Sequence, residues 1–355
     1  GMGFGYSTTV FGEIVFNTGM VGYTEALTDP SYNGQILTLT YPLVGNYGVP
    51  DSTQVDKDGI SKFFESDMMQ IRGLVVHELS QTASHWNLKI TLDEWMYNEK
   101  VPGISGIDTR AITKKLTSSG VMMAALVVSD TEIDVEEIKK ELANITTYTS
   151  EKFMDIVSTK EEKVYGDDNQ SVVVIDTGAK NAIVRNVREL GYTAIVVPWD
   201  TPFEKVMSYN PKGVVLSSGP GDPQNCPETI DTAKKLIESN VPTLGICLGA
   251  QIIGIAGNTE TYKLKYGHRG QNKPCINLET NQVYVTSQNH GYGIKPESLE
   301  KSDFKLWFSN ADDKTVEGIK HKTKNCIAVQ FHPEAAPGPF DCKYVFDELK
   351  KLMEK

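Results

Sequence analysis

Short β-branched runs alternate with helical segments through the second half of the chain, and this alternation constrains the fold more than any other feature. Buried-strand patterns occur at SVVVIDTG (171–178), TAIVVPW (193–199), GVVLSSGPG (213–221) and VPTLGIC (241–247), with helical segments between or after them. Such alternation builds βαβ units, whose strands run parallel in one sheet with helices on both faces. The sequence predicts an α/β domain over residues 171–355, with a mostly parallel open sheet and flanking helices.

The first half of the chain has a different pattern. Strand-like runs broken by glycines cover residues 12–28 and 34–48, and GIDTRAITKKL (106–116) begins a helix. We expect a smaller α+β domain over residues 1–150. Residues 151–170 are polar and weakly periodic, which is typical of a linker.

Charge and cysteine usage argue against several classes of function. The formal net charge of −11 opposes binding to nucleic acid or to an anionic membrane surface. No uninterrupted run of about 18 apolar residues marks a membrane span. Five widely spaced cysteines without a CxxC pair disfavour a disulfide framework or a zinc ribbon. We expect reduced thiols, a cytoplasmic location, no metal, and neither a nucleic-acid nor a membrane partner.

One cysteine lies where a predicted strand turns into a predicted helix. In VPTLGICLGAQIIGIAG (241–257), Cys247 has Gly245 and Gly249 close on either side, which permits a cramped backbone. The first N–H groups of the helix and its dipole favour negative charge on the sulfur. The N–H of Leu248 is then placed to hold an oxyanion beside the sulfur. A buried structural cysteine in a tight turn is the alternative reading.

A thiolate enzyme needs a base, and AVQFHPEAAPGP (328–339) offers His332 after an apolar strand. Glu334 returns to the same face in an extended segment and can accept from one ring nitrogen while the other faces sulfur. A purely structural His-Pro-Glu turn is the alternative. His290, in TSQNHGYG (286–293), is a weaker candidate base.

The loop SSGPGDP (217–223) follows a predicted strand and so lies at the carboxyl edge of the parallel sheet, where α/β folds place their sites. Its glycines let backbone N–H groups approach a ligand or an oxyanion. A simple surface turn would explain the glycines but not their position beside the cysteine.

Together, GICLGAQ, FHPE and SGPGDP resemble the class I (triad) glutamine amidotransferases. YKLKYGHRGQNKP (262–274), TSQNHGYG and the first domain narrow the resemblance to the small, glutaminase-subunit family of carbamoyl-phosphate synthetase. It runs from about residue 3 to the C-terminus. Amidotransferases of anthranilate or GMP synthesis lack the first domain, which makes that domain the deciding feature. Members of the family usually begin with one more short strand, which we expect to be missing here.

The resemblance implies roles for individual residues. Cys247 is the expected nucleophile, His332 the general base and acid, and Glu334 its orienting partner. A further set is expected to bind glutamine or its oxyanion: Ser31, Gly219, Gly221, Leu248, Gln251, Asn289, Gly291 and Tyr292. Because Ser31 comes from the first domain, the glutamine pocket is expected to lie partly at the domain interface.

The resemblance also implies a reaction and a partner. L-glutamine forms a γ-glutamyl thioester on the cysteine, and its ammonia passes through a tunnel to a large synthetase subunit. That subunit uses ATP and Mg²⁺ to make carbamoyl phosphate from bicarbonate, for pyrimidine and arginine synthesis. This chain has no GxxxxGK[ST] phosphate loop, so we expect no cofactor in it.

Three other functions remain open at this point. The chain could be a regulatory or assembly subunit that binds glutamine without hydrolysing it. It could be the amidotransferase subunit of another synthase. A free-standing hydrolase is the third alternative, because the cysteine elbow alone does not exclude one.

Overall fold

The computed structural model describes all 355 residues, which divide into two compact units. The first unit comprises Gly1–Asp56 and Ser61–Glu151, and the second comprises Lys57–Ile60 and Lys152–Lys355. None of the helices has the length and apolar character needed to cross a bilayer.

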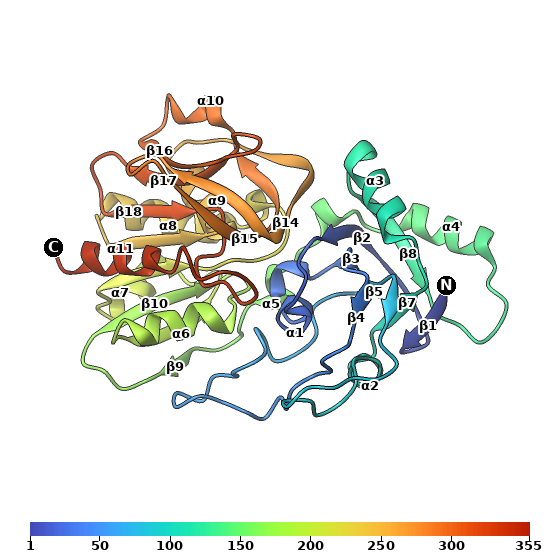
Figure 1. The fold of residues 1–355 in the computed structure, drawn as a ribbon. Helices are drawn as coiled ribbons and strands as arrows, with labels where there is room; N and C mark the ends of the chain where they lie inside the picture. The colour runs from blue at the N-terminus through green and yellow to red at the C-terminus, as the bar shows by residue number, and fades with distance from the viewer. The chain divides into compact units, whose positions relative to one another are not determined.

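The first unit is built on a mixed six-stranded sheet (Figure 1). In spatial order its strands are β1 (Met2–Gly5), β7 (Pro102–Ser105), β5 (Gly73–Val75), β3 (Gln35–Leu39), β2 (Thr9–Asn17) and β8 (Met122–Val127). The four inner strands are parallel and the two edge strands antiparallel. A separate two-stranded sheet pairs β4 (Leu43–Val44) with β6 (Glu78–Leu79).

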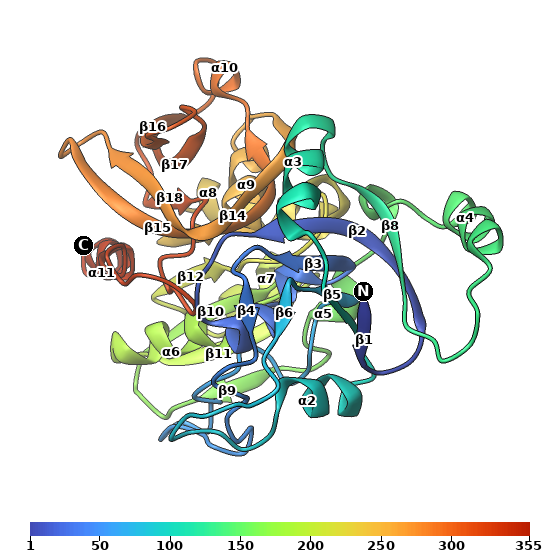
Figure 2. The ribbon, with the colours of Figure 1, turned by 45° about the vertical axis from the view of Figure 1, so that its right-hand side comes forward.

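Helices lie between these strands or follow the last of them. They are α1 (Tyr23–Leu27), α2 (Leu92–Asn98), α3 (Thr109–Ser119) and α4 (Val135–Asn144), with short 3-10 turns η1 (Pro30–Tyr32) and η2 (Tyr148–Ser150). Figure 2 shows α2 and α3 on opposite sides of the unit. Residues 12–28, expected as strand-like, include α1: β2 ends at Asn17, and Gly22, in a left-handed conformation, is the residue from which the helix begins. Asp108 caps α3 by accepting from the Ala111 N–H at 2.8 Å.

The second unit contains a ten-stranded sheet whose centre is parallel, as the strand–helix alternation predicted. The parallel strands, in spatial order, are β11 (Thr193–Pro198), β10 (Ser171–Asp176), β12 (Gly213–Leu216), β13 (Thr243–Ile246) and β18 (Cys326–Val329). Their side chains are almost all buried, which agrees with a strand covered on both faces. The α/β fold class is confirmed.

Antiparallel strands extend this sheet at both ends, so that it is less parallel overall than we expected. Beyond β18 lie β17 (Val316–His321), β16 (Phe304–Asn310), β14 (Thr261–Asn277) and β15 (Gln282–Ile294). At the other end, β9 (Lys163–Tyr165) pairs with β11. The expected linker at 151–170 therefore contains an edge strand and the helix α5 (Met154–Val157). Only three residues long and largely exposed, β9 has too little pattern to be seen in the sequence.

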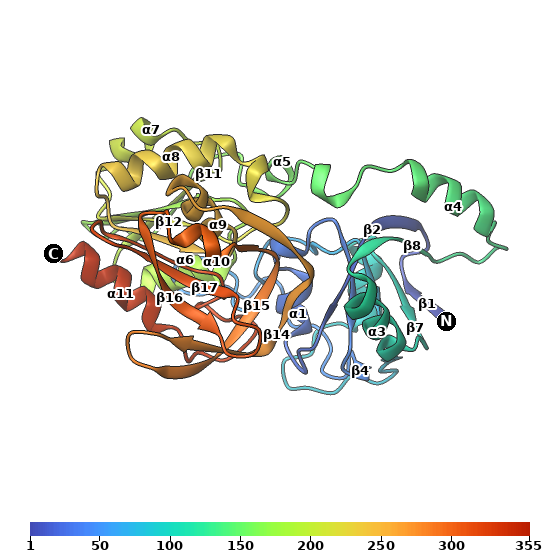
Figure 3. The same ribbon diagram turned by 90° about the horizontal axis from the view of Figure 1, so that it is seen from above.

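Helices cover both faces of the parallel strands (Figure 3). On one face, α6 (Asn181–Glu189) lies beside α11 (Tyr344–Met353), and Lys343 pairs with Glu189 between them. On the other face lie α7 (Phe203–Ser208), α8 (Pro227–Glu238) and α9 (Leu248–Ala256). The remaining short helices are η3 (Pro223–Asn225) and α10 (Pro296–Leu299).

Candidate active site at the Cys247 elbow

Cys247 lies between the last residue of β13 and the first residue of α9, on the turn that the sequence predicted. Its backbone has φ 54° and ψ −103°, a conformation that residues with a side chain rarely adopt. The Cys247 N–H donates to the carbonyl of Val329 at 2.9 Å, which ties the turn to β18. Strained backbone held in this way is typical of functional positions.

The two glycines beside Cys247 are required by close packing. A Cβ atom at Gly249 would overlap the carbonyl oxygen of Leu216, and one at Gly245 would lie 2.6 Å from the carbonyl oxygen of Gly249. The Gly249 N–H donates to the Ser217 carbonyl at 3.0 Å. The elbow is thereby held against the start of the SSGPGDP loop.

His332 and Glu334 form a buried pair just beyond β18. His332 Nδ1 lies 2.7 Å from Glu334 Oε1, and each residue is 2% exposed. Burial alone disfavours the protonated ring, but Glu334 and the Cys247 sulfur attract its charge and raise the pKa of His332 to about 10. The second ring nitrogen, Nε2, is buried without a hydrogen-bond partner. Nε2 is therefore the ring nitrogen available to exchange a proton with a substrate.

The Cys247 sulfur is buried beside β15 and Gln330, the residue that follows β18. Sγ donates to the carbonyl of Asn289 at 3.6 Å and accepts from Gln330 Nε2 at 3.7 Å. Cys247 lies near enough to His332 to help raise the pKa of its ring. The structure thus brings together Cys247, His332 and Glu334, which are up to 87 residues apart in the chain.

Lys180 belongs to this site, and the sequence reasoning missed it. Its side chain is 2% exposed, its Nζ lies 3.1 Å from Glu334 Oε1, and it also donates to the Ala335 carbonyl. Burial would raise the pKa of Glu334, but Lys180 and His332 lower it to about 2. Lys180 therefore keeps Glu334 ionised. The available signal was a lysine directly after a buried strand, SVVVIDTGAK, at the carboxyl edge of the sheet.

The expected oxyanion donors lie around the elbow. Leu248 is the first residue of α9, so its N–H belongs to the turn whose N–H groups have no acceptor within the helix. Gly219 and Gly221 lie in the loop after β12, the loop that the Gly249 N–H joins to the elbow. These positions agree with the predicted anion-holding role, which itself stays a prediction.

Several residues predicted to bind glutamine come together on α9 and β15. Gln251 Nε2 donates to the Tyr292 carbonyl at 2.9 Å and to Gln330 Oε1 at 3.1 Å. Asn289 and Gly291 lie in the same stretch of β15. The side chain of Gln251 therefore links the helix that follows Cys247 to this strand.

Ser31 lies in the first unit, in η1, where its N–H donates to the Asp29 carboxylate at 2.9 Å. Its hydroxyl is buried and has no hydrogen-bond partner. A part for Ser31 in the glutamine site, and a pocket at the domain interface, stay predictions.

His290, the weaker candidate base, has both ring nitrogens directed at its own strand. Nδ1 lies 2.7 Å from the Tyr292 carbonyl and Nε2 lies 3.2 Å from Gln288 Oε1. Burial, with the neighbouring His268 second, lowers the pKa of His290 well below its ordinary value. The geometry favours His332 as the base.

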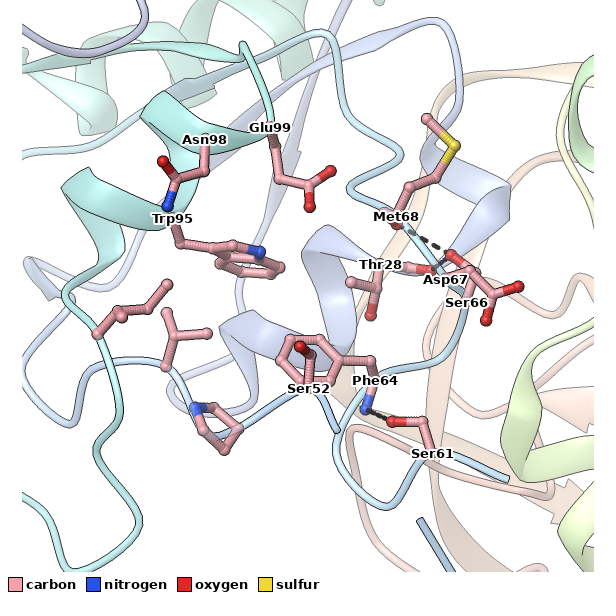
Figure 4. A pocket seen from close by; sticks show the side chains of 13 residues that line it. Thr28, Ser52, Ser61, Phe64, Ser66, Asp67, Met68, Trp95, Asn98 and Glu99 are labelled. Atoms are coloured by element: carbon pink, nitrogen blue, oxygen red, sulfur yellow. Dashed lines mark hydrogen bonds between the residues drawn. The ribbon is translucent and has the colours of Figure 1, made fainter. Parts of the chain in front are cut away.

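A pocket of about 380 Å³ lies within the first unit (Figure 4). Phe64 and Trp95 meet edge to face in its wall, with ring centroids 5.4 Å apart. The Ser66 hydroxyl in this wall lies within hydrogen-bond distance of the carbonyls of Thr28 and Met68. None of the residues predicted for the glutamine site lines the pocket.

Comparison with known proteins identifies both units. The family described as "Carbamoyl-phosphate synthase small chain, CPSase domain" matches residues 1–126. The family described as "Glutamine amidotransferase class-I" matches residues 173–352. The second match contains the cysteine elbow and the His332–Glu334 pair.

Relatives named carbamoyl phosphate synthase small chain match over the full length of the chain. The protein from Pyrococcus furiosus is 46% identical, and the match covers 100% of this chain and 94% of the relative. The protein from Sulfurisphaera tokodaii is 44% identical over 100% of this chain and 94% of the relative. The protein from Clostridium acetobutylicum is 43% identical over 99% of this chain and 96% of the relative. This chain therefore belongs to the carbamoyl phosphate synthase small-chain family.

Proposed function

We propose that this chain is the glutamine-hydrolysing subunit of a carbamoyl-phosphate synthase. The observation that carries the proposal is the arrangement of Cys247, His332 and Glu334 at a strained strand–helix elbow. The match of the first unit to the small-chain family distinguishes this function from that of the anthranilate and GMP amidotransferases, which lack such a domain.

The chemistry follows from the charges in the site. The Cys247 thiolate attacks the side-chain amide carbon of glutamine, forming a C–S bond. The oxyanion is held by the N–H groups of Leu248 and Gly219. The C–N bond then breaks, and protonated His332 donates a proton from Nε2 so that ammonia leaves.

The second half-reaction reverses these roles. Neutral His332 removes a proton from water, and the oxygen attacks the γ-glutamyl thioester. The C–S bond breaks, glutamate leaves, and the thiolate and the protonated ring are restored. Glu334 holds Nδ1 and, kept ionised by Lys180, stabilises the charged ring throughout.

The partner is a large synthetase chain that receives the ammonia. The designation of the relatives as small chains supports this partner. ATP and Mg²⁺ are used by that chain, and no cofactor is required for the chemistry at Cys247. A cytoplasmic location is supported by the five cysteines, all of them buried and free.

Glutamate release from glutamine tests the proposal, with C247S as the control and with the large chain added in a second assay. We expect slow release by the wild type alone, faster release with the large chain, and none from C247S. Binding of glutamine without release in either assay would favour the regulatory-subunit alternative.

A further inference from the structure

Glu317 lies in β17 and is fully buried, and four polar side chains surround its carboxylate. Oε2 accepts from Gln288 Nε2 at 3.0 Å. Oε1 accepts from Asn310 Nδ2 at 3.3 Å and from the Thr315 hydroxyl at 3.1 Å. His268 Nδ1 lies 3.4 Å from Oε1. These five residues, the Glu317 cluster, join strands β14, β15, β16 and β17.

His268 is the basic side chain of the cluster. Its Nε2 lies 2.8 Å from the Asp313 carboxylate, so the ring is placed between two acidic side chains. Burial alone lowers the pKa of His268, but Glu317 and Asp313 reverse this and raise it. A buried carboxylate is tolerated when it is both paired and hydrogen-bonded, and Glu317 meets both conditions.

The carboxylate of Glu317 determines how the amide of Gln288 is oriented. Only the N–H side of an amide can face a carboxylate, so Gln288 directs Oε1 toward His290 Nε2, 3.2 Å away. The neutral His290 ring keeps its proton on Nδ1 for the Tyr292 carbonyl at 2.7 Å. Its Nε2 therefore has no proton to donate to Gln288. The amide N–H groups of Gln288 also face the Thr286 hydroxyl at 3.1 Å and Cys275 Sγ at 3.3 Å, and Glu317 is the one carboxylate among these three acceptors.

Gln288 lies between the two residues of β15 that contact the predicted nucleophile and base. The carbonyl of Ser287 accepts from the His332 N–H at 2.9 Å. The carbonyl of Asn289 accepts from Cys247 Sγ at 3.6 Å. Anchoring the Gln288 side chain therefore restrains both carbonyls, one on each side of it.

We propose that Glu317 is a positioning residue for glutamine hydrolysis, an inference that rests on the proposed function. Through Gln288, and with His268 as its counter-ion, Glu317 holds the 287–289 segment so that Cys247 and His332 keep their reacting geometry. Displacements of about 1 Å in such a geometry cost on the order of a hundredfold in rate.

A metal ion is the competing reading of the same groups. His268, His290 and Glu317 each offer a ligand atom, and these atoms lie within 4.8 Å of one another. The hydrogen bonds and ion pairs already described engage the three side chains, which favours a charge-paired cluster over a metal centre. Metal content is accordingly one readout of the test.

The test is E317Q in the full chain, with kcat and KM for glutamine hydrolysis, thermal unfolding and metal content all measured. Gln is isosteric with Glu but has no charge to pair with His268 and does not dictate the orientation of Gln288. We expect kcat of the folded variant to fall at least about tenfold, with KM changing by less than about threefold.

The matched control is E13Q in the first unit. Glu13 is also buried, and its Oε2 accepts from the buried Gln35 Nε2 at 3.2 Å. Both substitutions therefore replace a buried glutamate that accepts a hydrogen bond from a glutamine side chain. We expect E13Q to lower the melting temperature while kcat stays within about twofold of the wild type.

If E317Q does not fold, the Q288M variant tests the positioning role instead. It removes the amide of residue 288 and leaves Glu317 paired with His268, Asn310 and Thr315. The same loss of kcat is expected. Wild-type kcat within about twofold in folded E317Q or Q288M overturns the inference, as does one tightly bound metal ion per chain. Absence of hydrolysis in the wild type would instead overturn the proposed function.

Discussion

Lys180 and Glu334 form an ion pair in the interior of the second unit, with Nζ 3.1 Å from Oε1 and both side chains at most 2% exposed. The same carboxylate oxygen lies 2.7 Å from Nδ1 of His332. Lys180 and His332 together lower the pKa of Glu334, which burial alone would raise. The Glu334 carboxylate in turn raises the pKa of His332, and Lys180 opposes that rise. The electrostatics of the candidate base depend on a lysine 152 residues away in the chain.

K180M tests this dependence through stability. Removing one partner of a buried ion pair leaves an uncompensated charge, and we expect the free energy of unfolding to fall by about 3–5 kcal/mol. Urea unfolding measures the change. The control is K139M, because Lys139 pairs with Glu136 on an exposed helix surface, where loss of the pair costs less than about 1 kcal/mol. Equal effects of the two substitutions would contradict the buried pair.

The pH dependence of stability tests the charge on His332. Because the pKa of this ring is raised from 6.5 to about 10, the folded protein binds the proton more tightly than the unfolded chain. The stabilisation is complete below pH 6.5 and is lost as the pH rises toward about 10. Asn cannot be protonated, so the melting-temperature advantage of wild type over H332N should shrink across this interval. An advantage that stays constant from pH 6.5 to 10 would refute a charged His332.

G249A tests the packing of the elbow. The new methyl group would overlap the Leu216 carbonyl oxygen, so either β12 or α9 must shift, at a cost of about 2 kcal/mol or more. The control is G293A in β15, where the nearest atom to a new Cβ is a Tyr262 ring carbon at the ordinary distance of 3.7 Å. Thermal unfolding of the two variants measures the difference. A G249A variant as stable as G293A would contradict the close packing of Gly249 against the Leu216 carbonyl.

Local sequence pattern was enough to place the reactive groups on their elements. Each of these groups is marked by a pattern about ten residues long. An apolar run and two glycines mark Cys247, and a second apolar run followed by a His-Pro-Glu turn marks His332 and Glu334. The structure pairs β18, the strand before His332, parallel to β13, which brings Cys247 and His332 to one edge of the sheet; the sequence alone did not show the direction of that strand.

The polar surroundings of the site could not be predicted in the same way. His268, Gln288, Asn310 and Glu317 come from four antiparallel strands, and their meeting depends on register. The β14–β15 pairing has register shifts, and a one-residue shift would turn every side chain to the opposite face. Periodicity in a single sequence does not contain that information.

Covalent labelling with an electrophilic glutamine analogue, read by intact mass and peptide mapping, tests the central claim most directly. One adduct per chain on Cys247, blocked by excess glutamine, is the result that a working thiolate in a glutamine site predicts. The measurement is made on the chain alone and again with the large synthetase chain, with C247S as the control. Absence of a glutamine-protected adduct on Cys247 in both states would contradict the assignment of this elbow as the active site.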